Sequence, residues 1–374
     1  MMAPCAVELG FELRVLAEAD DVSAVSAVAK APVGDYRDLQ ALRDFAQGLD
    51  VLTFDHEHVP SEHLQALIAE CVNVQPHPDA LIHAQDKLVM REVVDKLGLP
   101  NPAWGSVATV DELVAFGEQT GWPVVLKTPR GGYDGKGVRI VQDAAAAADA
   151  ADWFTGGALL VEEKVDFSRE LSALVARTPS GEARAWPVAH TIQVDGVCDE
   201  VIAPALDLPA EVAEAAQQAA LQLADELGVT GVMAAELFAT PGRGAGFVIN
   251  ELAMRPHNTG HWTQDGSVTS QFEQHLRAVL DLPLGDTSVL GGVVVMKNYL
   301  GGATTDLFSA YPRALAAEPT VKVHGYGKSV RPGRKIGHVN VVGRDASQVE
   351  DLRRRADRVA SIIRDGVDPQ EGKP

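Results

Sequence analysis

The sequence KTPRGGYDGKGV, residues 127–138, connects two short apolar runs that predict β-strands. Glycine has no Cβ atom, so a glycine-rich backbone can approach a phosphate closely and direct its N–H groups at the oxygens. Lys127 and Lys136 add positive charge. The stretch is neither a Walker A loop nor a dinucleotide-binding loop, because no GK[ST] sequence follows and the next expected element is a strand. A plain hairpin turn remains an alternative. The candidate binding residues of this loop are Gly131, Gly132, Tyr133, Asp134, Gly135, Lys136 and Gly137.

Two acidic residues downstream are predicted to face each other across antiparallel strands. Glu236 and Glu251 lie in apolar runs separated by a polar, glycine-containing loop, and a loop centred between Arg243 and Gly244 places them directly opposite each other. Facing carboxylates repel each other unless a cation neutralises them. Oxygen ligands from Glu236, Asn250 and Glu251 would suit Mg²⁺. A register shift of one residue would instead leave two separate exposed acids.

A polar stretch, RPHNTGHWT at residues 255–263, follows the second of these strands. Proline and glycine within it argue against a helical zinc site built from its two histidines. Arg255, His257 and Asn258 can instead bind an oxyacid and its acyl phosphate beside the metal. The alternative is that the histidines only brace the loop.

A basic stretch near the C-terminus, KSVRPGRKIGH at residues 328–338, stands out in an acidic chain. Its cations predict an anchor for a phosphate or sugar phosphate, with a solvated basic loop as the alternative. The residues concerned are Lys328, Arg331, Arg334 and Lys335. Weaker candidates, which at strand ends are often simply hydrated, are Glu162, Glu163, Glu170, His56, Glu57 and His58.

The overall composition limits the ligands and the location. The chain has 374 residues, a hydrophobic content of 46% and a formal net charge of −20, which fits a multidomain globular protein and disfavours binding to nucleic acids or anionic membranes. No run approaches the roughly 20 apolar residues of a membrane helix. Three widely spaced cysteines argue against a zinc site or a disulfide framework. We expect a cytoplasmic enzyme.

The pattern of elements predicts three parts. Residues 1–85 are predicted to form α/β units on a parallel sheet, with strands at 12–16 and 51–54. A helix at 83–98 marks the first boundary, and an alanine-rich stretch at 143–152 is expected to be a solvated helix. The middle part spans 86–285 with a lid at about 103–170, and the C-terminal part spans 286–374.

The order of these stretches resembles the ATP-grasp superfamily, and within it the 5-(carboxyamino)imidazole ribonucleotide synthases of purine biosynthesis. The similar stretches, between about residues 51 and 341, are TFDHEHVP, AQDK, KTPRGGYDGKGV, NELAMRPHNTGHWT, SQFEQHLRA and YGKSVRPGRKIGHVN. The resemblance implies a mixed α/β and α+β architecture: an ATP-grasp fold with an N-terminal parallel-sheet (pre-ATP-grasp) domain and a small β-rich C-terminal domain.

The resemblance also implies a reaction. ATP and bicarbonate would give carboxyphosphate, whose carboxyl group passes to the amine of 5-aminoimidazole ribonucleotide, and the enzyme would be a homodimer. It implies ATP contacts for Lys87, Lys127, the 131–137 loop, Glu162, Glu163, Glu170 and His190, and Mg²⁺ ligation by Glu236, Asn250 and Glu251. Bicarbonate would meet Arg255, His257 and Asn258, and the ribonucleotide would meet Glu57, Lys328, Arg331, Arg334 and Lys335.

The start of the chain departs from the family pattern. Members open with a strand and a GGGQL-like loop, whereas this chain begins as if inside the following helix, so we expect a segment of roughly 12–18 residues to be missing. Lys87 also stands where relatives carry arginine. Two alternatives follow: another ATP-grasp carboxylate–amine ligase, or a nucleotide-binding module without catalytic activity. The RPHN and RPGRKIGH stretches favour the purine enzyme.

Overall fold

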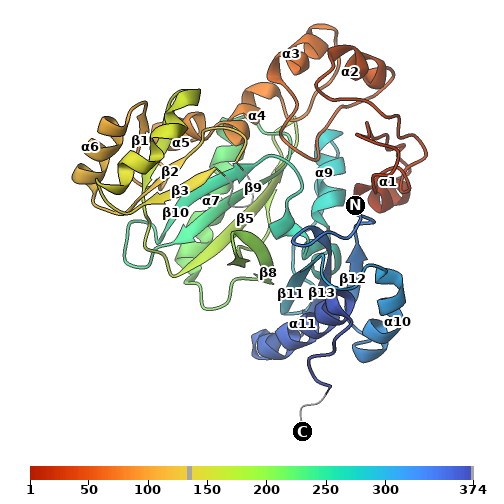
Figure 1. The fold of residues 1–374 in the computed structure, drawn as a ribbon. Helices are drawn as coiled ribbons and strands as arrows, with labels where there is room; N and C mark the ends of the chain where they lie inside the picture. Colours follow the sequence, from red (N-terminus) through yellow and green to blue (C-terminus); the bar gives the residue numbers. More distant parts are fainter. Residues whose placement is uncertain (133–136, 372–374) are drawn as a thin grey trace.

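The structure is a computed structural model that describes residues 1–132 and 137–371 (Figure 1). Its N-terminal region contains α1 (Met2–Leu9), α2 (Leu39–Ala46), α3 (Ser61–Ala69), α4 (Pro78–Gln85) and α5 (Lys87–Lys96). The prediction of regular strands at 12–16 and 51–54 is wrong. Within residues 1–85, all of which the structure describes, extended segments pair only through isolated parallel bridges, such as the one between Leu52 and Val74. A parallel pair requires a crossover that packs back on the sheet, usually a helix. Residues 18–29, which connect the first pair of bridged segments, form turns and bends and no helix.

The helix predicted at 83–98 is two helices, and Asp86 separates them. Asp86 has an extended backbone, with φ −131° and ψ 112°, and its side chain accepts hydrogen bonds from the N–H groups of Leu88 and Val89. An aspartate in this position caps a new helix N-terminus. The break starts α5 at Lys87, and Lys87 and Arg91 then lie four residues apart on one helical face.

The residues predicted to form a lid fold as a small α/β unit, at the left of Figure 1, for which we keep the name lid. It contains β1 (Trp104–Val107), α6 (Val110–Thr120), β2 (Val124–Lys127), β3 (Val138–Val141), the 3₁₀ helix η1 (Ala146–Gly156) and β4 (Leu159–Glu163). The strands form an antiparallel sheet in the order β1-β4-β2-β3, so the strands predicted on both sides of the glycine-rich loop are confirmed. The alanine-rich stretch is helical but only partly solvated, because Ala147 and Ala150 are buried against the lid core.

A large antiparallel sheet occupies the centre of the molecule and runs into the C-terminal part. Its strand order is β10-β9-β5-β7-β8-β11-β13-β12, with β6 at the side of β5. The strands are β5 (Arg169–Arg177), β6 (Ala183–Ala185), β7 (Ala189–Val194), β8 (Val197–Ala203), β9 (Gly231–Ala239), β10 (Phe247–Ala253), β11 (Val293–Leu300), β12 (Lys322–Gly325) and β13 (Lys335–Gly343). Because β8 pairs with β11, the sheet continues across residue 286, where a boundary was predicted.

Helices cover this sheet and bury its apolar side chains. They are α7 (Ala210–Glu226), η2 (Asn258–Gly260), α8 (Thr263–Gly266), α9 (Gln271–Val279), α10 (Leu307–Ala317), η3 (Ala346–Gln348) and α11 (Val349–Asp365). α7 packs on β5 in one core, and α11 packs on β11 and β13 in another. None of the helices in the described ranges is long and apolar enough to cross a membrane.

Candidate active site

The two carboxylates predicted to face each other do so, and a β-bulge brings this about. At the loop end of the ladder Phe247 faces Ala239, which centres the connection on Arg243 rather than between Arg243 and Gly244. The register then shifts at Asn250, and beyond it Glu251 faces Glu236. In a bulge two residues of one strand oppose one residue of the other. Asn250 and Glu251 therefore both lie opposite Glu236, and the predicted pairing is confirmed.

The charges around these carboxylates fit a divalent cation. Glu236 is partly buried, and its burial followed by the nearby Glu251 raises the pKa of Glu236 to about 8. His257 Nε2 lies 3.3 Å from Glu236 Oε1, and Lys87 Nζ lies 2.8 Å from Glu251 Oε1. Carboxylate and amide oxygens are the ligands that Mg²⁺ prefers. Within residues 1–132 and 137–371 no group of three His, Cys, Asp or Glu side chains is arranged to hold a metal. Asn250 would add an amide oxygen to the two carboxylates, and waters and nucleotide phosphates can complete the shell of Mg²⁺.

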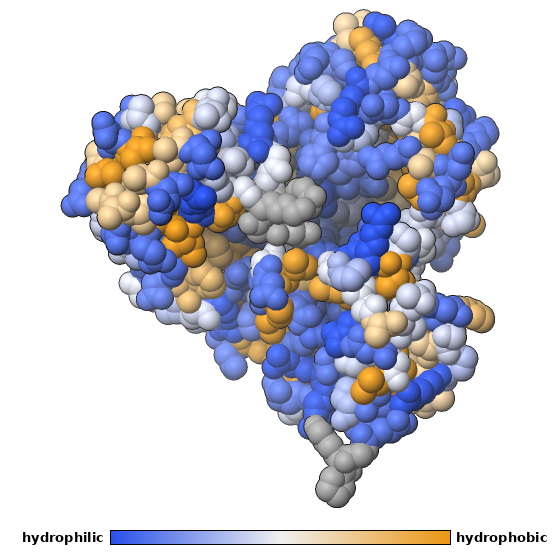
Figure 2. Space-filling view, in the orientation of Figure 1, coloured by the Kyte–Doolittle hydropathy of each residue, from blue (hydrophilic) through white to orange (hydrophobic). Residues whose placement is uncertain are grey.

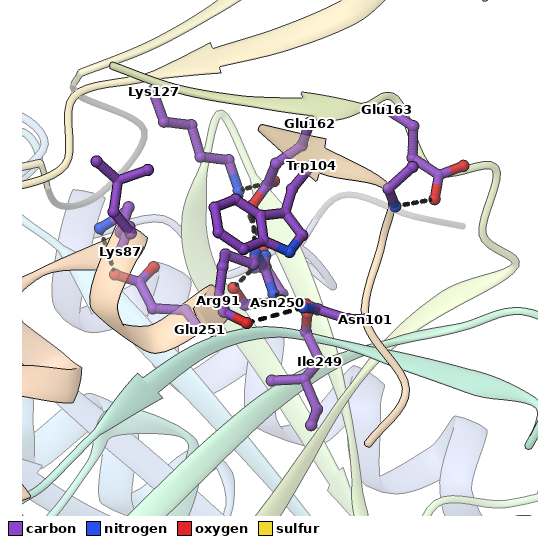
Figure 3. Close-up of polar contacts among 12 residues, drawn as sticks. Lys87, Arg91, Asn101, Trp104, Lys127, Glu162, Glu163, Ile249, Asn250 and Glu251 are labelled. Carbon is purple, nitrogen blue, oxygen red and sulfur yellow. Dashed lines mark hydrogen bonds and ion pairs between the residues drawn. The ribbon is translucent and has the colours of Figure 1, made fainter. Parts of the chain in front are cut away.

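A buried ion-pair network lies directly beside Asn250 (Figure 3). The Glu162 carboxylate, 3% exposed, accepts from Arg91 Nε at 2.6 Å and pairs with Lys127 Nζ at 2.7 Å. Burial alone would raise the pKa of Glu162, but Lys127 and Arg91 outweigh it and lower that pKa. Lys127 Nζ also donates to Asn250 Oδ1 at 3.3 Å. Lys127, which was predicted to contact phosphate, is thus held next to the predicted metal ligands.

The remaining candidates for nucleotide binding lie at the end of β4 and on two strands of the central sheet. Glu163 accepts from the backbone N–H of Ala103 at 2.7 Å and pairs with Arg243, which ties the lid to the loop between β9 and β10. Glu170 and His190 lie on the paired strands β5 and β7, and burial raises the pKa of Glu170 and lowers the pKa of His190. Of the glycine-rich loop, Tyr133, Asp134, Gly135 and Lys136 lie outside the described residues.

The RPHN loop adjoins the carboxylates. Arg255 Nε donates to Glu57 Oε2 at 2.7 Å, and Glu57 Oε1 accepts from the backbone N–H of Met254 at 3.2 Å. His257 Nδ1 lies 2.8 Å from Thr259 Oγ1, while burial followed by Arg255 holds the pKa of His257 well below its usual value. His257 is therefore neutral near pH 7. The side-chain nitrogen of Asn258 is buried and has no partner within the described ranges, so it can donate to a ligand.

A cavity of about 1230 Å³ extends from this loop toward the C-terminal part. Figure 2 shows the molecule hollowed between the N-terminal and C-terminal lobes, with hydrophilic residues along the rim. Arg255, Asn258, Lys328 and Lys335 line the cavity, so the basic stretch predicted as a phosphate anchor meets the RPHN loop there. Arg331 and Arg334 are not among the lining residues, and Arg334 instead donates to Ser329 Oγ at 2.7 Å.

Comparisons with known proteins agree with this architecture along the chain. Family models match at residues 1–85 (ribonucleotide synthetase preATP-grasp domain), 92–272 (ATP-grasp domain) and 294–352 (phosphoribosylaminoimidazole carboxylase C-terminal domain). An N5-carboxyaminoimidazole ribonucleotide synthase of Mycobacterium bovis is 52% identical over 354 residues, covering 93% of this chain and 82% of the relative. That of Corynebacterium ammoniagenes is 50% identical over 367 residues, covering 96% and 88%.

The chain belongs to the N5-carboxyaminoimidazole ribonucleotide synthase family. Solved members of the family share its fold: the Thermus thermophilus synthetase has a TM-score of 0.87 at 33% identity, covering 96% of this chain and 95% of that one. The Aspergillus clavatus synthase, solved with ADP and 5-aminoimidazole ribonucleotide, has a TM-score of 0.86 at 29% identity, covering 96% and 95%. The expected ATP-grasp fold and ligase class are confirmed.

One residue of this synthase family site escaped sequence reasoning. Arg91 is 0% exposed and contacts the lid, the linker between α5 and β1 that contains Asn101, and β10. The available signal was its spacing of four residues from Lys87 on an amphipathic helix. That spacing alone did not distinguish a site residue from an ordinary surface arginine.

Proposed function

We propose that this chain catalyses the ATP-dependent carboxylation of 5-aminoimidazole ribonucleotide with bicarbonate, giving N5-carboxyaminoimidazole ribonucleotide, ADP and phosphate. The observation that carries the proposal is that Lys127 and the facing carboxylates meet at Asn250, and that the RPHN loop, which contacts Glu236 through His257, also lines a cavity with Lys328 and Lys335. The Aspergillus clavatus relative, solved with ADP and 5-aminoimidazole ribonucleotide, supports the same pair of ligands.

The nucleotide and its metal ion would be held at the carboxylate end of the site. Glu236, Asn250 and Glu251 fit Mg²⁺, which supplies positive charge to the outer phosphates of ATP when bound. Lys127 and Lys87 would contact the same phosphates, and Lys87 would then exchange its contact with Glu251 for one with ATP. Glu163, Glu170 and His190 are proposed to bind the adenosine part. The Glu162 carboxylate is already paired with two cations, so we assign it to orienting Lys127.

The first chemical step is phosphoryl transfer to bicarbonate. A bicarbonate oxygen forms a bond to the γ-phosphorus of ATP, the bond from that phosphorus to the bridging oxygen breaks, and ADP leaves. Arg255, His257 and Asn258 would bind the resulting carboxyphosphate, with Arg255 oriented by its bond to Glu57. Donors fixed before the reaction stabilise the charge that develops on the transferred group.

The second step transfers the carboxyl group to the amine. The amine nitrogen of the ribonucleotide forms a bond to the carboxyl carbon, phosphate leaves with the electrons of the broken C–O bond, and the nitrogen loses a proton. Lys328 and Lys335 would anchor the sugar phosphate at the far side of the cavity, with Arg331 and Arg334 nearby in sequence. Homodimer formation and a cytoplasmic location are part of this proposal as well.

The test is release of phosphate from ATP, measured with and without each substrate. We expect turnover to require both bicarbonate and 5-aminoimidazole ribonucleotide, and radiolabelled bicarbonate to enter the ribonucleotide product. ATP hydrolysis that is independent of both compounds would reject the proposal. Dependence on a different amine or acid would point to another ATP-grasp ligase.

A further inference from the structure

Arg91 is a fully buried arginine at the meeting point of three parts of the molecule (Figure 3). Its Nε donates to Glu162 at the end of lid strand β4, at 2.6 Å. One terminal nitrogen donates to Asn101 Oδ1 in the linker at 2.8 Å and to the carbonyl of Ile249 in β10 at 2.6 Å. The other donates to the carbonyl of Asn250 at 2.8 Å. Lys127, the other cation of this network, reaches β10 only through the Asn250 side chain among the described residues, whereas Arg91 binds two backbone carbonyls of that strand.

The two backbone carbonyls that Arg91 binds lie at the bulge. The register of β10 shifts between Ile249 and Glu251, with Asn250 as the inserted residue. A bulge leaves backbone groups of the extra residue outside the ladder, and buried groups of this kind need another partner. A guanidinium donates in fixed directions from a rigid plane, which a lysine ammonium does not. β10 is the edge strand of the sheet and pairs only with β9, so Arg91 supplies the partner that these two carbonyls lack at the bulge.

The contacts of Arg91 close into a ring that contains the phosphate-loop lysine. Arg91 binds Glu162, Glu162 binds Lys127, Lys127 binds the Asn250 side chain, and the Asn250 carbonyl returns to Arg91. Moving any one member changes the geometry of the others. The ring thus fixes the lid strand that ends in Glu162 relative to the strand that carries the proposed metal ligands.

We propose that Arg91 is a positioning residue that holds the β10 bulge and thereby sets Asn250 and Glu251 opposite Glu236. Without the bulge, the register seen at residues 247–249 would continue, and Glu251 would turn to the other face of the sheet, because side chains alternate along a strand. The metal part of this inference rests on the proposed function. Its structural part, the dependence of the bulge on Arg91, does not.

The test uses the Arg91→Lys variant of the full chain, which keeps the charge but can satisfy fewer of the four acceptors. Calorimetry gives the affinity for ADP with and without Mg²⁺, and amide hydrogen exchange follows residues 247–253 in the absence of ligands. Loss of groups that orient metal ligands costs about 10–100-fold in metal affinity. We expect the enhancement of ADP binding by Mg²⁺ to fall by about that factor, and exchange at 249–251 to accelerate.

The control is Arg358→Lys, which weakens an arginine pair of similar length, 2.7 Å, between a partly exposed arginine and the buried Asp368 in the C-terminal part. It should leave both measurements as in the native protein. If Arg91→Lys does not fold, the charge-neutral pair Arg91→Gln with Glu162→Gln carries the same expectation. Native exchange at 249–251, together with a native Mg²⁺ enhancement, would overturn the proposal. If Mg²⁺ does not change the affinity of the native chain for ADP, the metal assignment is refuted instead. The hydrogen-exchange rate at residues 249–251 would then decide the role of Arg91.

Discussion

Replacing Glu251 by glutamine tests the facing carboxylates directly, because it removes a charge and keeps the shape. Glu251 is paired with Lys87 at 2.8 Å, but its side chain is 41% exposed. An ion pair of this exposure contributes about 0–1 kcal/mol to folding. The substitution also removes the negative charge of Glu251 that helps to raise the pKa of Glu236, which offsets part of that loss. We therefore expect the free energy of unfolding to change by less than about 1 kcal/mol.

The effect on catalysis should be much larger. A carboxylate that holds the charge-neutralising ion next to the transferred phosphoryl group acts mainly in the transition state, and losing one such group costs about 3–4 kcal/mol, or roughly 10²–10³-fold in rate. We expect kcat for phosphate release to fall by that factor. The Mg²⁺ concentration that gives half-maximal rate should rise as well.

The assay follows phosphate release over a Mg²⁺ titration at saturating ATP, bicarbonate and ribonucleotide, next to unfolding in urea. Glu70→Gln is the matched control, since it breaks an exposed 2.7 Å pair with Arg43 in the N-terminal region. That control should retain its rate within about twofold, because surface pairs contribute little. Near-native turnover in Glu251→Gln would refute the metal assignment, and a loss of rate accompanied by unfolding would refute the stability argument.

Two further predictions concern the cavity and the core. Lys328→Ala should raise KM for the ribonucleotide about 10–100-fold with little change in kcat, since a charge-assisted contact contributes about 1.5–3 kcal/mol. With the matching riboside, which has no phosphate, the variant and the native chain should have the same KM. An unchanged KM for the ribonucleotide would refute the assignment of Lys328 as a phosphate anchor. His275 is buried between Thr53 and the N–H of Val232, and burial lowers its pKa to about 4. The pKa of His275 is thus lower in the folded chain than in the unfolded chain, where it is near 6.5. The resulting contribution to the free energy of unfolding, about 3 kcal/mol, is present above the unfolded pKa and is lost as the pH falls toward 4. Urea unfolding across that window should show a smaller pH dependence in His275→Gln than in the native chain, and an equal pH dependence in the two proteins would refute this role of His275.

Sequence reasoning succeeded where local pattern and packing agree. The strands on both sides of the glycine-rich loop and the antiparallel pair β9 and β10 formed where they were predicted, because each apolar run is bounded by turn residues. It failed in the N-terminal region, where single parallel bridges replace strands. Parallel pairing depends on contacts distant in sequence, which a local apolar run does not specify. The break at Asp86 was also missed, since an acidic residue within a charged helix gives no distinct signal.

The facing carboxylates show why a correct prediction can rest on an incomplete reason. The predicted pairing of Glu236 with Glu251 assumed a regular ladder about a loop centre between two residues, but the loop is centred on Arg243 and a regular ladder from there would separate the two acids. The inserted Asn250 restores the pairing. A bulge has no reliable pattern in one strand alone, because its stabilising partner lies elsewhere in the chain. Here Arg91, from a helix far earlier in the sequence, binds both carbonyls at the shift. The register of the site is therefore a tertiary property, and substitutions on α5 should alter it as effectively as substitutions within β10 itself.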